Sequence, residues 1–411
     1  MKIHLPCILF LSIVWISCDT EKSDISVDDK VFFKFYGGEY VDEGLDVVQT
    51  QDNGYLIVGS TTSANSGENR DILLVKTDIN GNAQWLKTIG DVGDDIARKI
   101  KRLPDGGYII IGDFTLVEEN LHNREIFLLR LDASGNEVWR KTYGYSRDTV
   151  NFEDFGMDVS PNEQGNFLVV GHTKLNESDA EILFFVTNND GEVIGDQTLI
   201  GQNNTIEHAK SVIPDPTGTY LAYIAGYTNH SENQGQDGFN MFLINVNKDG
   251  SIPFPNIIGG LRDEYADAMI LTDDQGLLVL GSEVQGNSSR LLLRKLNLRL
   301  DVEWEVFPDI EGVNNLKGAG LCKTNDGYVV LAHRRITGID SKMILYKVDF
   351  QGFMLWDTYI SFGGEFNDKA NSIIVDDQQH LVITGQMAFT ALGSNAKMCL
   401  IKTRSDGQLK P

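Results

Sequence analysis

The sequence predicts an all-β fold in which seven four-stranded sheets form one closed ring, and three observations support this prediction. A turn, an apolar strand and a final small residue recur seven times along the 411 residues. A strand, a tight turn and a second strand follow each copy after a polar loop. A strand-like segment near the beginning of the chain matches the strand that the last repeat lacks. Repeats of about 54 residues with four strands each are typical of the blades of a β-propeller.

The first recurring segment is clearest at Asp52–Gly59, which reads DNGYLIVG. Its best counterparts are DGGYIIIG at Asp105–Gly112 and QGNFLVVG at Gln164–Gly171. The weaker copies end at Gly226, Gly281, Ala332 and Gly385. The seven end points lie between 51 and 59 residues apart. Short apolar runs between turn residues predict buried strands, so each period begins with a strand pair.

The second recurring segment predicts a hairpin in every repeat. Asp71–Asp78 leads into the turn Asn80-Gly81, and later repeats carry a similar turn. These later turns contain Gly135-Asn136, Asp190-Gly191, Asp249-Gly250, Leu300-Asp301, Gln351-Gly352 and Asp406-Gly407. Asp, Asn and Gly tolerate the positive φ angles of tight hairpin turns. Each repeat therefore gains two more strands.

Four tryptophans stand at one repeat position, just after the hairpin. They are Trp85, Trp139, Trp304 and Trp356, with Ile194 and Phe254 at this position in the third and fourth copies. One large apolar residue per period is expected where neighbouring blades pack. We predict a structural role for them, because residues at one repeat position lie too far apart around a ring to form a single sugar-stacking platform.

The two ends of the repeat region predict how the ring closes. The chain reaches Gly407 to Leu409 where the seventh repeat should begin its last strand, and residues 31–38 align with the last strand of the first repeat. The N-terminal strand is therefore expected to complete the seventh blade, which leaves no free sheet edge. Residues 31–411 are predicted to form one seven-bladed domain.

An apolar run at Leu5–Ile16 precedes this domain and follows Lys2. The run is too short to span a bilayer and has the composition of a secretory signal peptide. It ends at Ser17-Cys18, which resembles the bacterial lipoprotein signal. The resemblance implies a signal peptide at 1–17, lipidation of Cys18 and a linker at 18–30. Trp15 departs from the usual aliphatic residue of that signal, so an ordinary cleaved signal peptide is the alternative.

The whole repeat pattern, Asp-Gly-Gly-Tyr with four apolar residues and Gly, then a hairpin and Trp, resembles propeller repeats of secreted proteins and lipoproteins of Bacteroidota. The resemblance extends from about Val31 to Leu409. It implies an outer-membrane lipoprotein, at the cell surface or facing the periplasm. It does not specify a function, since propellers carry binding, scaffolding and enzymatic roles.

Charge and cysteine content narrow the choice of partners and of cross-links. The chain has 59 acidic and 35 basic residues, a net charge of −24, which excludes nucleic acid and anionic lipid surfaces as binding partners. Only Cys322 and Cys399 fall in the folded part. Two cysteines are not a disulfide framework, and both sit in apolar strands, where buried free thiols are expected. A disulfide between them is the alternative.

An acidic residue two positions before a small residue opens most repeats. The acids are Asp42, Asp95, Asp154, Glu207, Glu264 and Asp368. We predict that they cap backbone N–H groups, and a ring of carboxylates around a cation is the alternative. The Asp-x-x-Gly turns resemble half of an EF-hand loop but lack its bidentate Glu. No cofactor is therefore expected, with Ca²⁺ as the alternative.

No catalytic motif is visible in the sequence. The histidines after the signal are His122, His172, His208, His230, His333 and His380. None of them has metal-ligand spacing, and Gly-x-Ser-x-Gly and phosphate-loop motifs are absent from the sequence. His172 and His333 share a repeat position, but in the third and sixth copies, which lie nearly opposite each other. The sequence therefore predicts no catalytic residue and no enzyme.

The irregular loops hold the candidate binding residues, because loops vary while a scaffold persists. The longest interval contains Tyr145, Arg147, Phe152 and Phe155, and a second polar loop carries His230. These side chains could hold a partner protein or a glycan, or they could fill a junction between blades.

The sequence favours a non-catalytic, lipid-anchored propeller that binds other outer-membrane or surface proteins, as an accessory or scaffold subunit of an envelope complex. The alternative is a glycan-binding protein at the cell surface. A second alternative is a polysaccharide lyase or hydrolase, which requires a cluster of His, Tyr or carboxylate side chains at the channel mouth.

Overall fold

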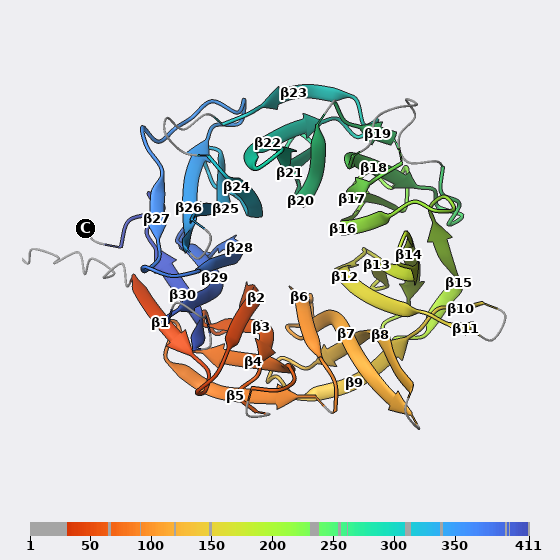
Figure 1. Ribbon diagram of the computed structural model, residues 1–411, viewed down its shortest axis with the longest axis horizontal. Coiled ribbons are helices and arrows are strands. Elements are labelled where there is room, and N and C mark those ends of the chain that lie inside the picture. Colours follow the sequence, from red (N-terminus) through yellow and green to blue (C-terminus); the bar gives the residue numbers. More distant parts are fainter. Residues whose placement is uncertain are drawn as a thin grey trace, which may run out of the picture. The chain divides into compact units, whose positions relative to one another are not determined.

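Seven four-stranded antiparallel sheets stand around a common axis in the computed structural model (Figure 1). The structure describes residues 31–409 except 65–66, 91, 119–120, 148–149, 231–237, 254–255, 261, 309–313, 338–339, 391–392 and 394. These residues form strands and turns without a helix, and none of them offers a helical membrane span. The all-β fold with seven four-stranded blades is confirmed.

Each blade runs outward from the axis, with its first strand innermost in the ring. From inside to outside the blades are β2 (Asp42–Gln49), β3 (Tyr55–Thr61), β4 (Asp71–Thr77) and β5 (Ala83–Ile89); β6 (Ile96–Arg102), β7 (Tyr108–Glu118), β8 (Leu121–Leu131) and β9 (Glu137–Tyr143); β12 (Glu153–Pro161), β13 (Phe167–Asn176), β14 (Asp179–Thr187) and β15 (Val193–Ile200); β16 (Glu207–Pro214), β17 (Ala222–Thr228), β18 (Asn240–Val246) and β19 (Asn256–Ile258); β20 (Asp263–Leu271), β21 (Leu277–Gln285), β22 (Ser288–Leu296) and β23 (Val302–Val306); β24 (Leu316–Lys323), β25 (Tyr328–Thr337), β26 (Asp340–Val348) and β27 (Ile360–Phe362); and β28 (Lys369–Val375), β29 (Leu381–Ala388), β30 (Ala396–Thr403) and β1 (Phe32–Tyr36). We number the blades one to seven in this order.

The innermost strands share a bulge just after the small residue of the acid-x-small pattern. In blade one the register shifts between Gly44 and Asp46, and the other six innermost strands shift at the same repeat position. The small residue that ends each apolar segment, glycine in six blades and Ala332 in blade six, pairs with this site. A Cβ at Gly59 would overlap the carbonyl oxygen of Glu43, so the backbones approach too closely for a larger residue.

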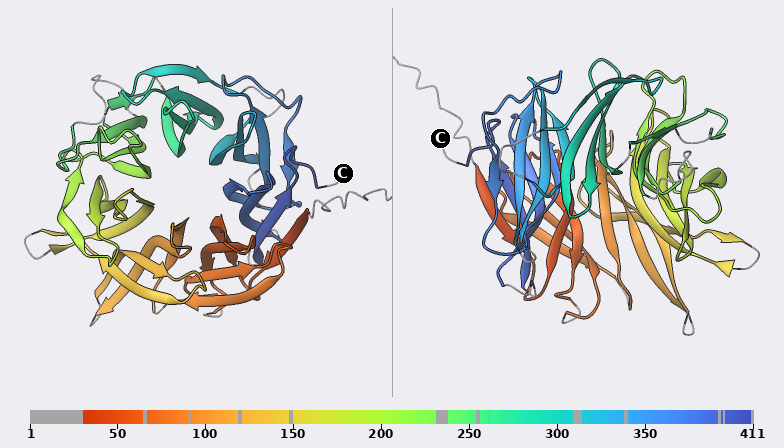
Figure 2. Two further views of the ribbon diagram at one scale, coloured as in Figure 1. Left: turned by 180° about the vertical axis from the view of Figure 1, so that it is seen from behind. Right: turned by 45° about the horizontal axis from the view of Figure 1, so that its top comes forward.

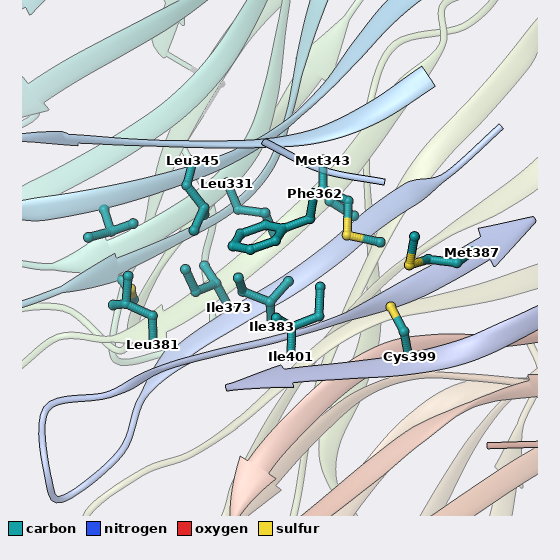
Figure 3. Close-up of a cluster of buried hydrophobic side chains, with 13 residues drawn as sticks. Leu331, Met343, Leu345, Phe362, Ile373, Leu381, Ile383, Met387, Cys399 and Ile401 are labelled. Carbon is teal, nitrogen blue, oxygen red and sulfur yellow. The ribbon is translucent and has the colours of Figure 1, made fainter. Parts of the chain in front are cut away.

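The hydrophobic core lies between neighbouring blades. The two middle strands of each blade are buried on both faces, as at β3 and β4, because a blade stands between two others. Figure 3 shows the cluster between blades six and seven, where Leu331 and Leu345 face Ile373 and Ile383. Cys322 and Cys399 both belong to this cluster and are free thiols.

The tryptophans connect blades one, two, five and six to the hairpin turn of the next blade. Trp85 lies against Gly135, Trp139 against Gly191, Trp304 against Gly352 and Trp356 against Gly407. These four glycines have φ between 76° and 88°, a region that suits glycine. The turn glycine therefore serves twice, for the backbone angle and for the space that the indole occupies. The predicted structural role of the tryptophans is confirmed.

The N-terminal strand closes the ring as predicted. β1 pairs with β30 in an antiparallel register from Phe32 opposite Lys402 to Tyr36 opposite Met398. The Tyr36 hydroxyl donates a hydrogen bond to the Gly81 carbonyl at 2.7 Å, which joins this strand to blade one. The first and last parts of the described chain thus share the seventh sheet.

The repeated acids hold the chain where it enters the innermost strands. Asp154 accepts hydrogen bonds from the Tyr145 N–H at 2.7 Å and the Thr173 hydroxyl at 2.6 Å. Asp368 accepts from the N–H groups of Gly364 at 2.7 Å and Ala388 at 3.0 Å. Both carboxylates are fully buried and accept backbone N–H groups, which is the capping role that the sequence favoured, whereas Glu264 binds the Arg294 guanidinium at 3.2 Å.

Candidate functional site

A central channel runs along the propeller axis, with a cavity of about 250 Å³ lined by residues from all seven innermost strands. At one end of the channel, which we call the mouth, each innermost strand contributes the residue that follows its first acid or the equivalent position. The residue directly opposite on the second strand shares its face. The seven pairs are Glu43–Ser60, Ile96–Asp113, Phe155–His172, His208–Tyr227, Tyr265–Ser282, Lys317–His333 and Lys369–Gln386.

Five aromatic rings from blades three, four and five form a continuous row at the mouth, which we call the ring stack: Phe155, His172, His208, Tyr227 and Tyr265. Phe155 stacks on His172 with ring centroids 4.8 Å apart, and His172 stacks on His208 at 4.0 Å. His208 Nδ1 and the Tyr227 hydroxyl share a hydrogen bond of 2.9 Å. Tyr265 meets Tyr227 edge to face at 4.9 Å.

Cationic side chains surround the ring stack. The Lys210 Nζ lies 5.7 Å from the centre of the Tyr227 ring, and the Arg124 guanidinium lies 5.3 Å from that of Phe155. Arg98 is held by the buried Asp113 at 2.8 Å. Both arginines and Lys210 belong to blades two to four, so the positive charge gathers beside the histidines.

Burial and this charge set the protonation of the two histidines. Burial lowers the pKa of His208 to about 4, and the neighbouring Lys210 adds to the effect. Burial also lowers the pKa of His172 well below its usual value, followed by the charges of His208 and Lys210. Both imidazoles are therefore neutral at neutral pH. His172 Nδ1 is buried and has no hydrogen-bond partner among the residues that the structure describes.

Burial and neighbouring charges also shift the pKa values of the tyrosine and the lysine of the site. Burial raises the pKa of Tyr227 to about 12, so its hydroxyl keeps its proton. Burial lowers the pKa of Lys210 to about 8, while Asp267 opposes this shift and Lys317 and Arg98 strengthen it. A neutral imidazole, a protonated phenol and a cation thus share one site, which is the set of groups that proton transfer beside an anion requires.

The structure separates the residues that the sequence grouped in one loop. Phe155 is on β12 and belongs to the ring stack. Tyr145 and Phe152 stack on each other at 6.3 Å, and Tyr145 packs on the core between blades two and three. Between them the strands β10 (Ser146–Arg147) and β11 (Val150–Asn151) form a hairpin that projects outward from the ring (Figures 1 and 2). Arg147 therefore lies on this hairpin and not in the ring stack.

The two other candidate positions lie elsewhere. His230 follows the end of β17, is half-buried and donates its backbone N–H to the Thr228 hydroxyl at 2.8 Å. Cys18 lies outside the described residues, so its lipidation stays a prediction.

Sequence reasoning missed His208, Lys210, Tyr227 and Tyr265. A signal for three of them was present, because each occupies the position one or three residues after a repeated acid. Those positions face the channel, and reading them across the seven repeats would have collected the side chains of the mouth. Among the described residues, no three His, Cys, Asp or Glu side chains come together as a metal-ligand set.

Comparison with known proteins finds solved structures that share the fold of this chain. No protein-family model and no curated protein matches this sequence. A PL25 ulvan lyase structure is 10% identical, with a TM-score of 0.57 over 90% of this chain and 96% of the lyase. Polysaccharide lyase Uly1 is 8% identical, with a TM-score of 0.55 over 90% and 92% of the two chains. A protein of unknown function from Dyadobacter fermentans is 8% identical, with a TM-score of 0.50 over 77% and 94%.

This chain is a seven-bladed β-propeller. At such low identities the likeness shows the fold alone, and membership of a Bacteroidota family stays a prediction. The prediction that the chain is not an enzyme is corrected, because solved structures that cover nine tenths of it include polysaccharide lyases. The sequence carries no sign of a catalytic site because the residues gathered at the mouth come from different blades and form no local motif.

Proposed function

We propose that this chain is a polysaccharide lyase that cleaves an acidic, uronate-containing polysaccharide by β-elimination. The observation that carries the proposal is the hydrogen-bonded His208–Tyr227 pair, 2.9 Å apart, beside Lys210 at the channel mouth. One of the lyases with this fold is bound to -[GlcA(1-4)Rha3S]-, an acidic saccharide. The likeness of fold supports the reaction class, and the mouth residues support its chemistry.

β-Elimination needs three groups around the uronate ring. A cation must stabilise the carboxylate as the C5 proton leaves, because the developing negative charge spreads onto it. A base takes the C5 proton, a double bond forms between C4 and C5, and the bond from C4 to the leaving oxygen breaks. An acid then protonates the leaving oxygen.

The residues of the mouth can fill these roles. Lys210 faces the incoming carboxylate, with Arg98 behind it. The neutral His208 imidazole accepts the C5 proton, and the Tyr227 hydroxyl protonates the leaving oxygen. The hydrogen bond between His208 Nδ1 and the Tyr227 hydroxyl then gives the imidazolium proton a path to the phenolate, so the pair neither loses nor gains a proton overall.

Substrate binding strengthens the base in this scheme. Part of the low pKa of His208 comes from the charge of Lys210. A carboxylate bound to Lys210 neutralises that charge, so the pKa of His208 rises when the substrate is in place. His172 stacks beneath His208 and fixes the plane of its ring.

A hydrolase fits the mouth less well. Glycoside hydrolases place two carboxyl groups on either side of the bond that they cleave. The ring stack contains no carboxylate, and the nearby Asp113 is occupied by Arg98 at 2.8 Å and Arg124 at 3.6 Å. The comparisons give the scaffold role that the sequence favoured no support. Secretion, with an anchor at Cys18, would bring the chain to its substrate and stays a proposal.

The test is elimination activity on a panel of uronate polysaccharides, followed by the ultraviolet absorbance of the unsaturated product. Tyr227→Phe removes the proton donor and should lower kcat about 10²- to 10⁴-fold, the usual contribution of a general acid. Tyr220→Phe is the matched control, since Tyr220 packs edge to face on Tyr223 outside the mouth, and it should keep full activity.

Full elimination activity in Tyr227→Phe would overturn the assignment. Tight glycan binding without any unsaturated product from the panel would instead favour a glycan-binding protein, for which the row of five rings supplies a stacking surface.

A further inference from the structure

A second concave site lies at the mouth, away from the ring stack, and we call it the basic pocket. It has a volume of about 620 Å³ and lies between blades five, six and seven, with Lys317, His333, Arg335 and Lys369 in its lining. Lys317 and His333 form one of the seven register pairs that define the mouth, so the pocket opens at the same end of the propeller as the ring stack. Its volume is within the range of small-molecule sites.

The charge of the basic pocket is opposite to that of the chain. The net charge of the chain is −24, yet the lining contains two lysines, one arginine and no acidic residue. Lys369 pairs with Glu43 at 3.5 Å. Within the described part of the chain, no carboxylate lies at ion-pair distance from Lys317 or Arg335, and both side chains are exposed. The charge of Lys317 acts on Asp267 in the channel without an ion pair, so the cations of Lys317 and Arg335 both face the hollow.

The remaining polar groups of the pocket also suit an anion. His333 Nδ1 accepts the Ala370 N–H at 3.1 Å, so the proton of the neutral ring is on Nε2, which is left as a donor. Burial lowers the pKa of His333 to about 4, and the charges of Lys317 and Lys369 add to this effect. Asparagine and serine side chains complete the lining, as at Asn315 and Ser341.

Lys317 connects the two sites. It lines the basic pocket, and its charge contributes to the low pKa of Lys210 beside the ring stack. Blade five also borders both, since Tyr265 belongs to the ring stack and Ser289 to the pocket. A polyanionic chain that crosses the mouth would therefore meet Lys210 beside the ring stack and Lys317 and Arg335 at the basic pocket.

We propose that the basic pocket binds a second anionic group of the polysaccharide, a sulfate ester or a uronate carboxylate, at sugars beyond the one held at the ring stack. This rests on the proposed lyase function. The pocket makes the protein selective for long polyanionic chains, because two separated anions must be matched at once. It contributes to binding and not to the chemical step.

The test compares Lys317→Gln/Arg335→Gln with the control Lys248→Gln/Arg299→Gln. The control removes the same charge from exposed residues in hairpin turns at the opposite end of the blades. Binding is measured by retardation in gels that contain ulvan, desulfated ulvan or unsulfated polygalacturonate, and kinetics are measured on polymer and on short oligosaccharides. Removal of exposed charges should leave folding intact, which thermal unfolding checks.

The pocket variant should bind polymer about tenfold more weakly than wild type, since each exposed charge contact contributes severalfold. At a pH well below 8, where Lys210 is protonated with or without Lys317, the KM for polymer should rise equally, with kcat and the kinetics on short oligosaccharides unchanged. If the pocket and control variants differ in retardation by ulvan but not by desulfated ulvan, the bound group is a sulfate ester. If they also differ in retardation by polygalacturonate, the bound group is a carboxylate. Equal retardation of pocket and control variants would overturn the proposal.

Failure of the lyase assignment is distinguishable from failure of the pocket. Tyr227→Phe should lose elimination and keep the retardation that depends on Lys317. If neither wild type nor any variant shows elimination activity but the pocket variant still loses retardation, the proposal for the pocket is supported and the lyase assignment is not. If the pocket variant loses kcat on short oligosaccharides, Lys317 belongs to the catalytic site and the separate pocket is refuted.

Discussion

The contact between Trp85 and Gly135 predicts a large cost for a single added methyl group. Gly135 has φ of 77°, and a Cβ there would overlap Trp85 Cζ2 and lie 3.0 Å from Cη2. An L-residue in this backbone region costs about 1–2 kcal/mol, and overpacking of a filled site costs a further 1–3 kcal/mol or so. Gly135→Ala should therefore destabilise the propeller by about 2–5 kcal/mol.

Gly165 offers a matched control. Its φ is 78°, and no heavy atom lies within 4 Å of the Cβ that alanine would add. The turn is closed by the same hydrogen bond, from the Gly165 N–H to the Asn162 carbonyl at 3.0 Å, as the turn of Gly135. Gly165→Ala should cost only the backbone term of about 1–2 kcal/mol.

Denaturant unfolding of both variants measures the difference, with the m-value checked for a change in the transition. A double variant with Trp85→Leu removes the indole, and in that background Gly135→Ala should cost no more than Gly165→Ala. Equal costs of Gly135→Ala and Gly165→Ala in the presence of Trp85 would refute the role assigned to the indole.

Two further predictions follow from the site and from the ring. If His208 must be neutral and Lys210 charged, kcat/KM should be bell-shaped, falling as the pH drops through about 4, where His208 gains a proton, and as it rises through about 8, where Lys210 loses one. Lys210→Arg should move the alkaline limb to higher pH because guanidinium stays charged, and a limb that does not move would exclude Lys210 as the group that titrates there. Deletion of residues 31–36 should leave the edge of β30 unpaired and cause self-association in size-exclusion chromatography with light scattering, whereas a monomer of unchanged stability would show that closure by β1 is dispensable.

The fold is encoded locally, which is why the repeat alone predicts it. Most turns carry Asn or Gly where φ is positive, as at Gly81 and Gly135, and the apolar runs are bounded by such turns. In three other turns the residue with positive φ is Gln275, Leu300 or Gln379. The position of Trp85 in the period predicts packing between blades, and the strand at residues 31–38 predicts closure. Residues close in sequence dictate these features, so the features can be predicted without knowing which residues lie nearby in space.

The site depends on contacts that no local pattern contains. His172 is on the second strand of blade three, and His208 is on the first strand of blade four, at a different repeat position. They stack at 4.0 Å because adjacent blades face each other across the mouth. The histidines that share a repeat position, His172 and His333, belong to blades three and six, and they line the ring stack and the basic pocket respectively.

Strand register and burial are two further properties of the site that the sequence does not reveal. The bulge after each small residue sets which side chains turn toward the channel, and it brings Tyr227 opposite His208. Burial at the mouth then lowers the pKa of His208 and raises that of Tyr227, which composition cannot reveal. The repeated sequence therefore specifies a ring and its closure, while the meeting of blades three, four and five creates the chemistry, because proton transfer depends on distances and desolvation that arise only when separate blades pack together.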